Sequence, residues 1–186
     1  MTKTIIFFKK NLILIVFLYI SNIYSNDFKK SSFLLLSNGF QISGIKKEDF
    51  IQSNISNTYN LSWGKWINNN MGYMIGYRGD YFKYINDEAR HYYSFFYSDI
   101  LLNKAIFSKK KYKELSSIHL GFGYFYNKFN KNNIVCGNVG LINEFILNTR
   151  INAIINVSAI IGWDLYQNDE DILPSINFGI IYKYKS

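Results

Sequence analysis

Eight segments of about ten residues alternate apolar side chains with small or polar ones, and this alternation most constrains the fold. The segment from Met71 to Tyr81 shows it clearly. Bulky apolar or aromatic residues fill most odd positions, and glycine, Arg78 and Asp80 fall between them. Successive side chains of a β-strand point to opposite faces, so each segment predicts a strand with one apolar and one polar face. An even number of such strands is typical of a transmembrane β-barrel.

We therefore predict an all-β fold, an eight-stranded antiparallel up-and-down barrel. Its strands are expected at residues 33–43, 58–67, 71–85, 92–103, 117–127, 134–148, 152–165 and 173–184. Tight polar turns are expected at Asn68–Asn70 and around Arg150, and longer connections at 44–56, 86–91, 128–133 and 166–172. Short periplasmic turns and longer outer loops are the rule in such barrels. The basic connection 104–116 breaks this rule, because it is long and yet falls at the periplasmic end.

The N-terminal residues have the pattern of a secretory signal peptide. A lysine-bearing start precedes the apolar run 11–20, and Ser25 offers a small residue before the cut, although Ile23 is larger than usual. We expect residues 1–25 to be the signal peptide and residues 26–186 to be the barrel domain. A transmembrane anchor is the alternative, but the apolar run falls short of the ~20 residues that a spanning helix needs.

Composition excludes several classes of protein. The 186-residue chain carries a formal net charge of +8, but its basic residues are scattered apart from Lys109–Lys111, and an exported protein rarely meets nucleic acid. Cys136 is the only cysteine, so no intramolecular disulfide can stabilise the fold. Aromatic residues make up 19% of the chain, more than a small soluble core needs. Tyrosine and tryptophan suit the two membrane interfaces of a barrel, and the basic charge suits lipid phosphates and lipopolysaccharide.

The polar faces of the strands are expected to line the lumen. Ionisable residues of both signs fall on them: Arg78, Asp80, His119, Glu144, Asp164 and Lys183. Because a lone buried charge is costly, we predict a cross-lumen network of ion pairs and hydrogen bonds. Eight strands leave only enough room for side chains, so the lumen should be plugged. The segment 92–103 leaves its faces undecided, because Asp99 shares a face with Tyr93, Phe95 and Tyr97.

Periodicity alone does not distinguish this barrel from a soluble, lipocalin-like one with an apolar interior. Glycine favours the membrane barrel. Gly72, Gly76, Gly121 and Gly123 fall on the more polar faces, where small residues suit a narrow lumen, while bulky apolar residues suit lipid.

The chain also resembles the small outer-membrane barrels of the OmpA/OmpX-like group. The resemblance covers nearly all of the mature chain and lies in its pattern, notably Leu120-Gly-Phe-Gly-Tyr124, Gly140-Leu-Ile-Asn-Glu-Phe145 and Phe178-Gly-Ile-Ile-Tyr-Lys-Tyr184. It implies an integral protein of the outer membrane. That group often ends on an aromatic residue, whereas Lys185 and Ser186 follow Tyr184 here.

Catalytic chemistry finds little support in the sequence. His91 is expected in a solvated outer loop and His119 in the lumen, and neither forms a His-x-Ser pair on one strand face. Cys136 is expected to be a small inward filler. No metal-ligand spacing, phosphate loop or nucleotide motif is present, so we expect no cofactor and no enzymatic activity.

Four functional hypotheses remain open. The first is a structural or surface-interaction barrel that acts through its outer loops, in particular the charged stretches Lys46–Asp49 and Asp169–Asp171. The second is a subunit of an outer-membrane secretion or conjugation assembly, in which the 104–116 connection contacts a protein partner. The third is a lipid A-modifying enzyme, and the fourth is transport through the lumen.

Overall fold

The structure, a computed structural model, describes residues 31–43, 54–67, 71–82, 90–103, 114–129, 131–163, 165 and 170–185. These residues form eight β-strands, whose bounds are β1 (Ser31–Ser43), β2 (Asn54–Trp66), β3 (Met71–Phe82), β4 (His91–Asn103), β5 (Glu114–Asn127), β6 (Asn132–Ile146), β7 (Ile151–Trp163) and β8 (Glu170–Lys185). The predicted strands are all present. The largest difference lies in β2, which begins at Asn54 instead of Thr58; β3 ends earlier than predicted, at Phe82, and β5 and β8 begin earlier, at Glu114 and Glu170.

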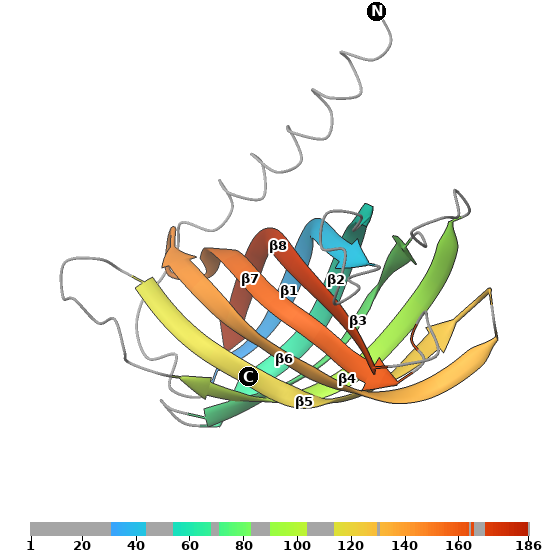
Figure 1. The fold of residues 1–186 in the computed structure, drawn as a ribbon. Coiled ribbons are helices and arrows are strands. Elements are labelled where there is room, and N and C mark those ends of the chain that lie inside the picture. Colours follow the sequence, from blue (N-terminus) through green and yellow to red (C-terminus); the bar gives the residue numbers. More distant parts are fainter. Residues whose placement is uncertain are drawn as a thin grey trace, which may run out of the picture.

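The strands form one closed antiparallel barrel in sequence order, as Figure 1 shows. Closure comes from the pairing of β1 with β8, in which Leu36 lies opposite Ile180 and Phe33 opposite Lys183. Because every strand has two neighbours, no strand edge is left without backbone partners. The predicted eight-stranded up-and-down topology is confirmed.

Two tight hairpins, β2–β3 and β6–β7, lie at one end of the barrel, which we call the turn end. In the hairpin between β6 and β7, the side-chain oxygen of Asn148 accepts hydrogen bonds from the backbone N–H groups of Arg150 and Ile151, both at 2.8 Å. Between β2 and β3, the Ile67 N–H donates to the Met71 carbonyl at 2.9 Å. The opposite end, which we call the loop end, includes a shorter connection than predicted, since β6 begins at Asn132.

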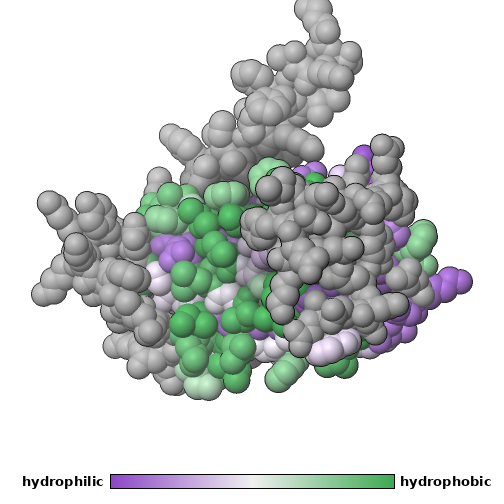
Figure 2. Space-filling view, viewed as in Figure 1, coloured by the Kyte–Doolittle hydropathy of each residue, from purple (hydrophilic) through white to green (hydrophobic). Residues whose placement is uncertain are grey.

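The outer wall is apolar and the interior is largely polar. Outward side chains such as Phe96 and Phe122 are 56% and 74% exposed, whereas inward Arg78 and Asn177 are 2% and 0% exposed. Figure 2 shows apolar residues gathered over the visible part of the wall. Water would penalise such an exposed apolar belt, but a bilayer solvates it. The distribution therefore identifies a membrane barrel and excludes the lipocalin-like alternative. The described residues include no helix long and apolar enough to cross a membrane.

The faces of β4 correct the simple rule that bulky residues face lipid. Tyr93, Phe95, Tyr97 and Asp99 point inward and are buried, while Phe96 and its alternate neighbours point outward. The reason is that Asp99 finds hydrogen-bond partners inside the barrel, which lipid cannot provide.

Glycines on neighbouring strands make room for these inward rings. A Cβ atom added to Gly123 of β5 would lie 2.3 Å from the Phe95 ring, and one added to Gly76 of β3 would lie 2.6 Å from Tyr97. Large and small residues are thus matched across strands, so the interior is packed by aromatic rings as well as by polar groups.

Candidate functional site in the barrel interior

Three clusters of polar side chains occupy the interior at different heights. They are a Glu144–Lys183 pair near the turn end, an Asp99–His119 pair near the middle, and an Arg78 cluster nearer the loop end. Inward positions of neighbouring strands supply all of these groups, because alternation places every second side chain in the lumen.

The cluster nearest the turn end is an ion pair. Lys183 Nζ of β8 lies 2.6 Å from Glu144 Oε2 of β6, and the side chains are 10% and 4% exposed. Asn152 of β7, the strand between them, donates its Nδ2–H to the same carboxylate oxygen at 2.6 Å. The charges are therefore paired across two strand boundaries, which offsets much of their desolvation cost.

The middle cluster connects four consecutive strands. His119 Nδ1 of β5 lies 2.8 Å from Asp99 Oδ2 of β4, and Asn138 of β6 donates to the same oxygen at 2.6 Å. The other ring nitrogen, Nε2, lies 3.2 Å from Asn156 Oδ1 of β7. Both nitrogens of the imidazole thus face oxygen acceptors, so its orientation is fixed from two sides.

The third cluster spans the barrel. Arg78 of β3 donates to Ser158 Oγ of β7 at 3.3 Å and to the Leu173 carbonyl of β8 at 3.3 Å. In the order of the closed barrel, β3 and β7 lie on opposite sides. A single side chain therefore bridges the lumen.

Neighbouring groups complete the Arg78 cluster. Arg78 also contacts Gln41 Oε1 at 3.5 Å, and Tyr93 donates its hydroxyl to the same oxygen at 2.6 Å. Among the described residues no carboxylate lies within ion-pair distance of Arg78, and its Nε–H has no hydrogen-bond partner. Within the described part of the chain, neutral oxygens solvate this guanidinium.

Stacked rings fill the interior at the loop end. Tyr93 stacks on Phe125 at 5.0 Å between centroids, and Phe82 stacks on His91 at 5.7 Å. Phe129 meets the His91 ring edge-on at 4.1 Å. The prediction of a solvated His91 is wrong: it is the first residue of β4 and is only 1% exposed, because these rings enclose it.

The predicted lumen residues are not all in one network. Arg78, His119, Glu144 and Lys183 are buried inside, but they belong to three separate clusters. Asp80 lies at the loop end of β3, is partly exposed, and takes part in none of these clusters. Asp164 lies outside the described residues.

Two further predictions from the sequence concern Cys136 and the expected loop stretch Asp169–Asp171. Cys136 is inward and 2% exposed, with its thiol 3.7 Å from the Ile134 carbonyl. The expected loop residues Glu170 and Asp171 belong instead to β8, and Asp171 is buried. The strand extends because both residues pair with the last residues of β7. The basic run Lys109–Lys111 and the stretch Lys46–Asp49 lie outside the described residues.

Sequence reasoning missed the partners that organise these clusters. Asp99 and Gln41 are central, but the faces of residues 92–103 were undecided and Gln41 is an uncharged residue among many. The strand pairing holds the missing signal: Asp99 lies opposite Gly121 and His119 lies opposite Leu101, so the two residues are diagonal neighbours on the same face of adjacent strands.

The arrangement offers hydrogen bonding and charge pairing. The Asp99–His119 pair resembles two parts of a hydrolase triad, but no serine hydroxyl bonds to His119 in the described part of the chain. Those residues also include no group of three His, Cys, Asp or Glu side chains able to hold a metal ion.

Comparisons with known proteins show the fold. No family model and no curated protein matches the sequence. Solved structures do match: Neisserial surface protein A has a TM-score of 0.55 at 9% identity, covering 84% of this chain and 97% of that one. The N-terminal barrel domain of Pseudomonas aeruginosa OprF has a TM-score of 0.53 at 8% identity, with 84% and 98% covered. OprG of the same organism has a TM-score of 0.50 at 12% identity, with 85% and 98% covered. The chain has the fold of the small eight-stranded outer-membrane barrels.

Proposed function

We propose that this integral barrel is a non-conducting protein of the outer membrane, with a structural or surface-interaction role carried by the connections at its loop end. The observation that carries the proposal is the bridge from Arg78 on β3 to Ser158 on the opposite strand β7, at 3.3 Å. A side chain that reaches across the lumen leaves no room for a solute to pass at that height.

The rings at the loop end add a second obstruction. Tyr93, Phe125 and Phe82 are at most 1% exposed, and they stack on one another or on His91. With the lumen filled, the surfaces left for function are the lipid-facing wall and the connections between strands. The matching fold of a protein named for its place on the neisserial surface supports a role at the cell surface.

The proposed role differs from transport through the lumen and from catalysis inside it. Transport needs a path past Arg78, and a hydrolase needs a nucleophile beside His119. The buried hydrogen bonds to Asp99 and Asn156 occupy both nitrogens of that histidine. In the proposed role these groups stabilise the barrel and perform no chemistry.

Conductance in a planar lipid bilayer tests the proposal. The wild-type protein should give no current steps above those of a protein-free bilayer. A variant with Arg78→Ala, Gln41→Ala and Tyr93→Ala should give small steps, because it removes the side chains that bridge the lumen. Regular, well-resolved steps from inserted wild-type protein would overturn the non-conducting role.

A further inference from the structure

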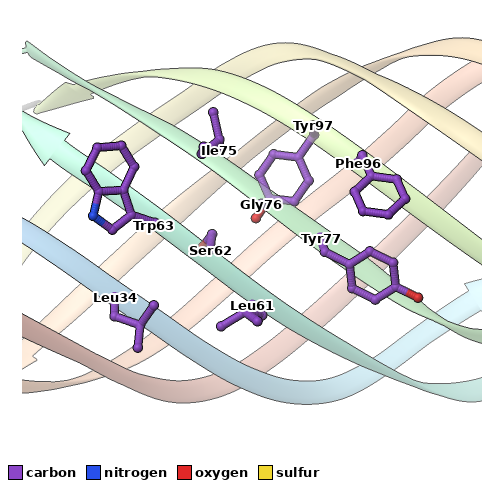
Figure 3. A pocket seen from close by; sticks show the side chains of 9 residues that line it. All are labelled: Leu34, Leu61, Ser62, Trp63, Ile75, Gly76, Tyr77, Phe96 and Tyr97. Carbon is purple, nitrogen blue, oxygen red and sulfur yellow. The ribbon is translucent and has the colours of Figure 1, made fainter.

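A shallow groove crosses the lipid-facing wall over β1 to β4. Its volume is about 460 Å³, within the range of roughly 300–1,000 Å³ that small-molecule sites occupy. Six outward side chains form its walls, as Figure 3 shows: Leu34, Leu61, Trp63, Ile75, Tyr77 and Phe96. None of them is charged, so the groove is suited to hydrocarbon.

The groove lies between two rows of side chains that run across the strands. One row joins Leu34, Trp63 and Ile75, which lie opposite one another in register. The other joins Leu61, Tyr77 and Phe96 in the same way. Inward residues, among them Ser62 and Gly76, separate the rows. Because their side chains point into the barrel, the backbone forms the floor.

Fixed aromatic contacts hold the two rows apart. The Trp63 ring packs edge-on against Tyr73 at 5.7 Å, and its indole N–H donates to the Tyr184 hydroxyl, so it is held toward the turn end. The Tyr77 ring packs against Tyr59 at 5.9 Å, and its hydroxyl bonds to Ser94 Oγ at 3.1 Å, so it is held toward the loop end.

Figure 3 shows the result of these contacts. Trp63 and Tyr77 lie on either side of Gly76, and the Tyr77 hydroxyl points away from Trp63. The groove is therefore preformed, and an occupant does not have to reorganise its walls.

A positively charged side chain, that of Lys65, lies beyond the turn-end wall of the groove. Lys65 follows Trp63 on the outward face of β2, is partly buried, and lies opposite Tyr73 in register. A lysine at this position extends its ammonium group toward the membrane surface, while its methylene groups contact apolar neighbours. Lys65 therefore supplies positive charge at lipid headgroup height.

We propose that the groove holds one acyl chain of an anionic glycerophospholipid whose phosphate lies beside Lys65. The groove provides the apolar contact and Lys65 the charge complementarity. The β2–β3 and β6–β7 connections at this end are short, as at the periplasmic end of such barrels, so the lipid belongs to the leaflet built of glycerophospholipids and not of lipopolysaccharide. The inference needs the barrel to lie in a membrane, but it is independent of conductance and of any role of the loops.

Tryptophan fluorescence tests this proposal directly, because Trp63 lines the groove and Trp163 faces lipid on the distant strand β7, where it is 59% exposed. Two full-length variants each keep one reporter: Trp66→Phe with Trp163→Phe, and Trp63→Phe with Trp66→Phe. Both are folded into vesicles in which brominated phosphatidylglycerol or brominated phosphatidylcholine is the quencher. Trp63 should show a preference for phosphatidylglycerol of about fivefold over Trp163, the effect of one lysine beside an anionic lipid.

The charge is tested in the Trp63 reporter background. Lys65→Gln should abolish the preference, whereas Lys128→Gln, which removes an exposed lysine at the loop end, should leave it unchanged. Equal preference at Trp63 and Trp163 would overturn the proposal and indicate ordinary bulk lipid only. Quenching of Trp163 but not of Trp63 would also overturn it, since another protein or a second copy of the chain would then cover the groove.

Discussion

Glu144 and Lys183 form an ion pair in which each charge needs the other, because both side chains are almost fully removed from water. Replacing Lys183 with methionine keeps most of the side-chain volume but leaves a buried carboxylate whose remaining hydrogen bond, within the described residues, comes from Asn152. We expect Lys183→Met to lower the free energy of unfolding by about 3 to 5 kcal/mol, the usual cost of an uncompensated buried charge. Urea unfolding in lipid vesicles measures this loss.

The double variant Glu144→Gln with Lys183→Met is the matched control. It removes both charges and keeps an amide oxygen that accepts from Asn152, so most of the lost stability should return. If the double variant is as unstable as the single one, the pair matters through packing and not through charge.

Individual lumen positions could be predicted from sequence, but their partners could not. Alternation predicted inward positions for Arg78 and His119, and both side chains are buried in the barrel. The contact of Arg78 with Ser158 joins residues 80 positions apart on opposite strands. Local periodicity says which way a side chain points, and only the closed barrel determines what it meets.

The strand β4 shows why the faces of an element are harder to predict than its existence. Its length and end were close to prediction, yet its two faces looked equally suitable for lipid. Asp99 decided the outcome, because a carboxylate in lipid has no partners, whereas inside the barrel it has His119 and Asn138. The inward rings of this strand are accommodated by glycines that the neighbouring strands supply.

Gly123 on β5 provides a test of this matching between strands. Gly123→Ala places a methyl group against the Phe95 ring, where the unrelaxed contact would be 2.3 Å. Because overpacking forces rings away from their preferred positions, we expect a loss of about 1 to 3 kcal/mol in the free energy of unfolding. The change is measured by urea unfolding in vesicles, followed by tryptophan fluorescence.

Gly137 on β6 is the control for that substitution. Among the described residues, a Cβ atom there would meet the Ile161 carbonyl alone, at 3.7 Å, which is an ordinary contact. Gly137→Ala should therefore change stability much less than Gly123→Ala. Equal losses at the two positions would mean that general strand flexibility, and not the room for Phe95, explains the need for glycine.

At the scale of the whole molecule, hydrogen-bonded clusters connect strands that are not neighbours. The Arg78 cluster joins β3 to β7 and β8, and Tyr97 of β4 donates to Asn60 of β2 at 2.7 Å. Eight strands and their closure could be predicted because period-two alternation and turn residues are local signals. Connection lengths were less predictable: β2 begins at Asn54, β5 at Glu114, β6 at Asn132 and β8 at Glu170, so the connections before these strands are shorter than expected.

We conclude that the protein is a membrane barrel with an apolar outer wall and a polar interior. The most direct test of this conclusion is heat-modifiability of the protein in purified outer membranes. The protein should stay with the membrane fraction after carbonate washing, and its unboiled form should migrate differently from its boiled form on a denaturing gel. This result is expected because closed backbone pairing and the buried polar clusters keep the barrel folded in detergent. A protein that is released into the soluble fraction and shows no mobility shift on boiling would contradict the account.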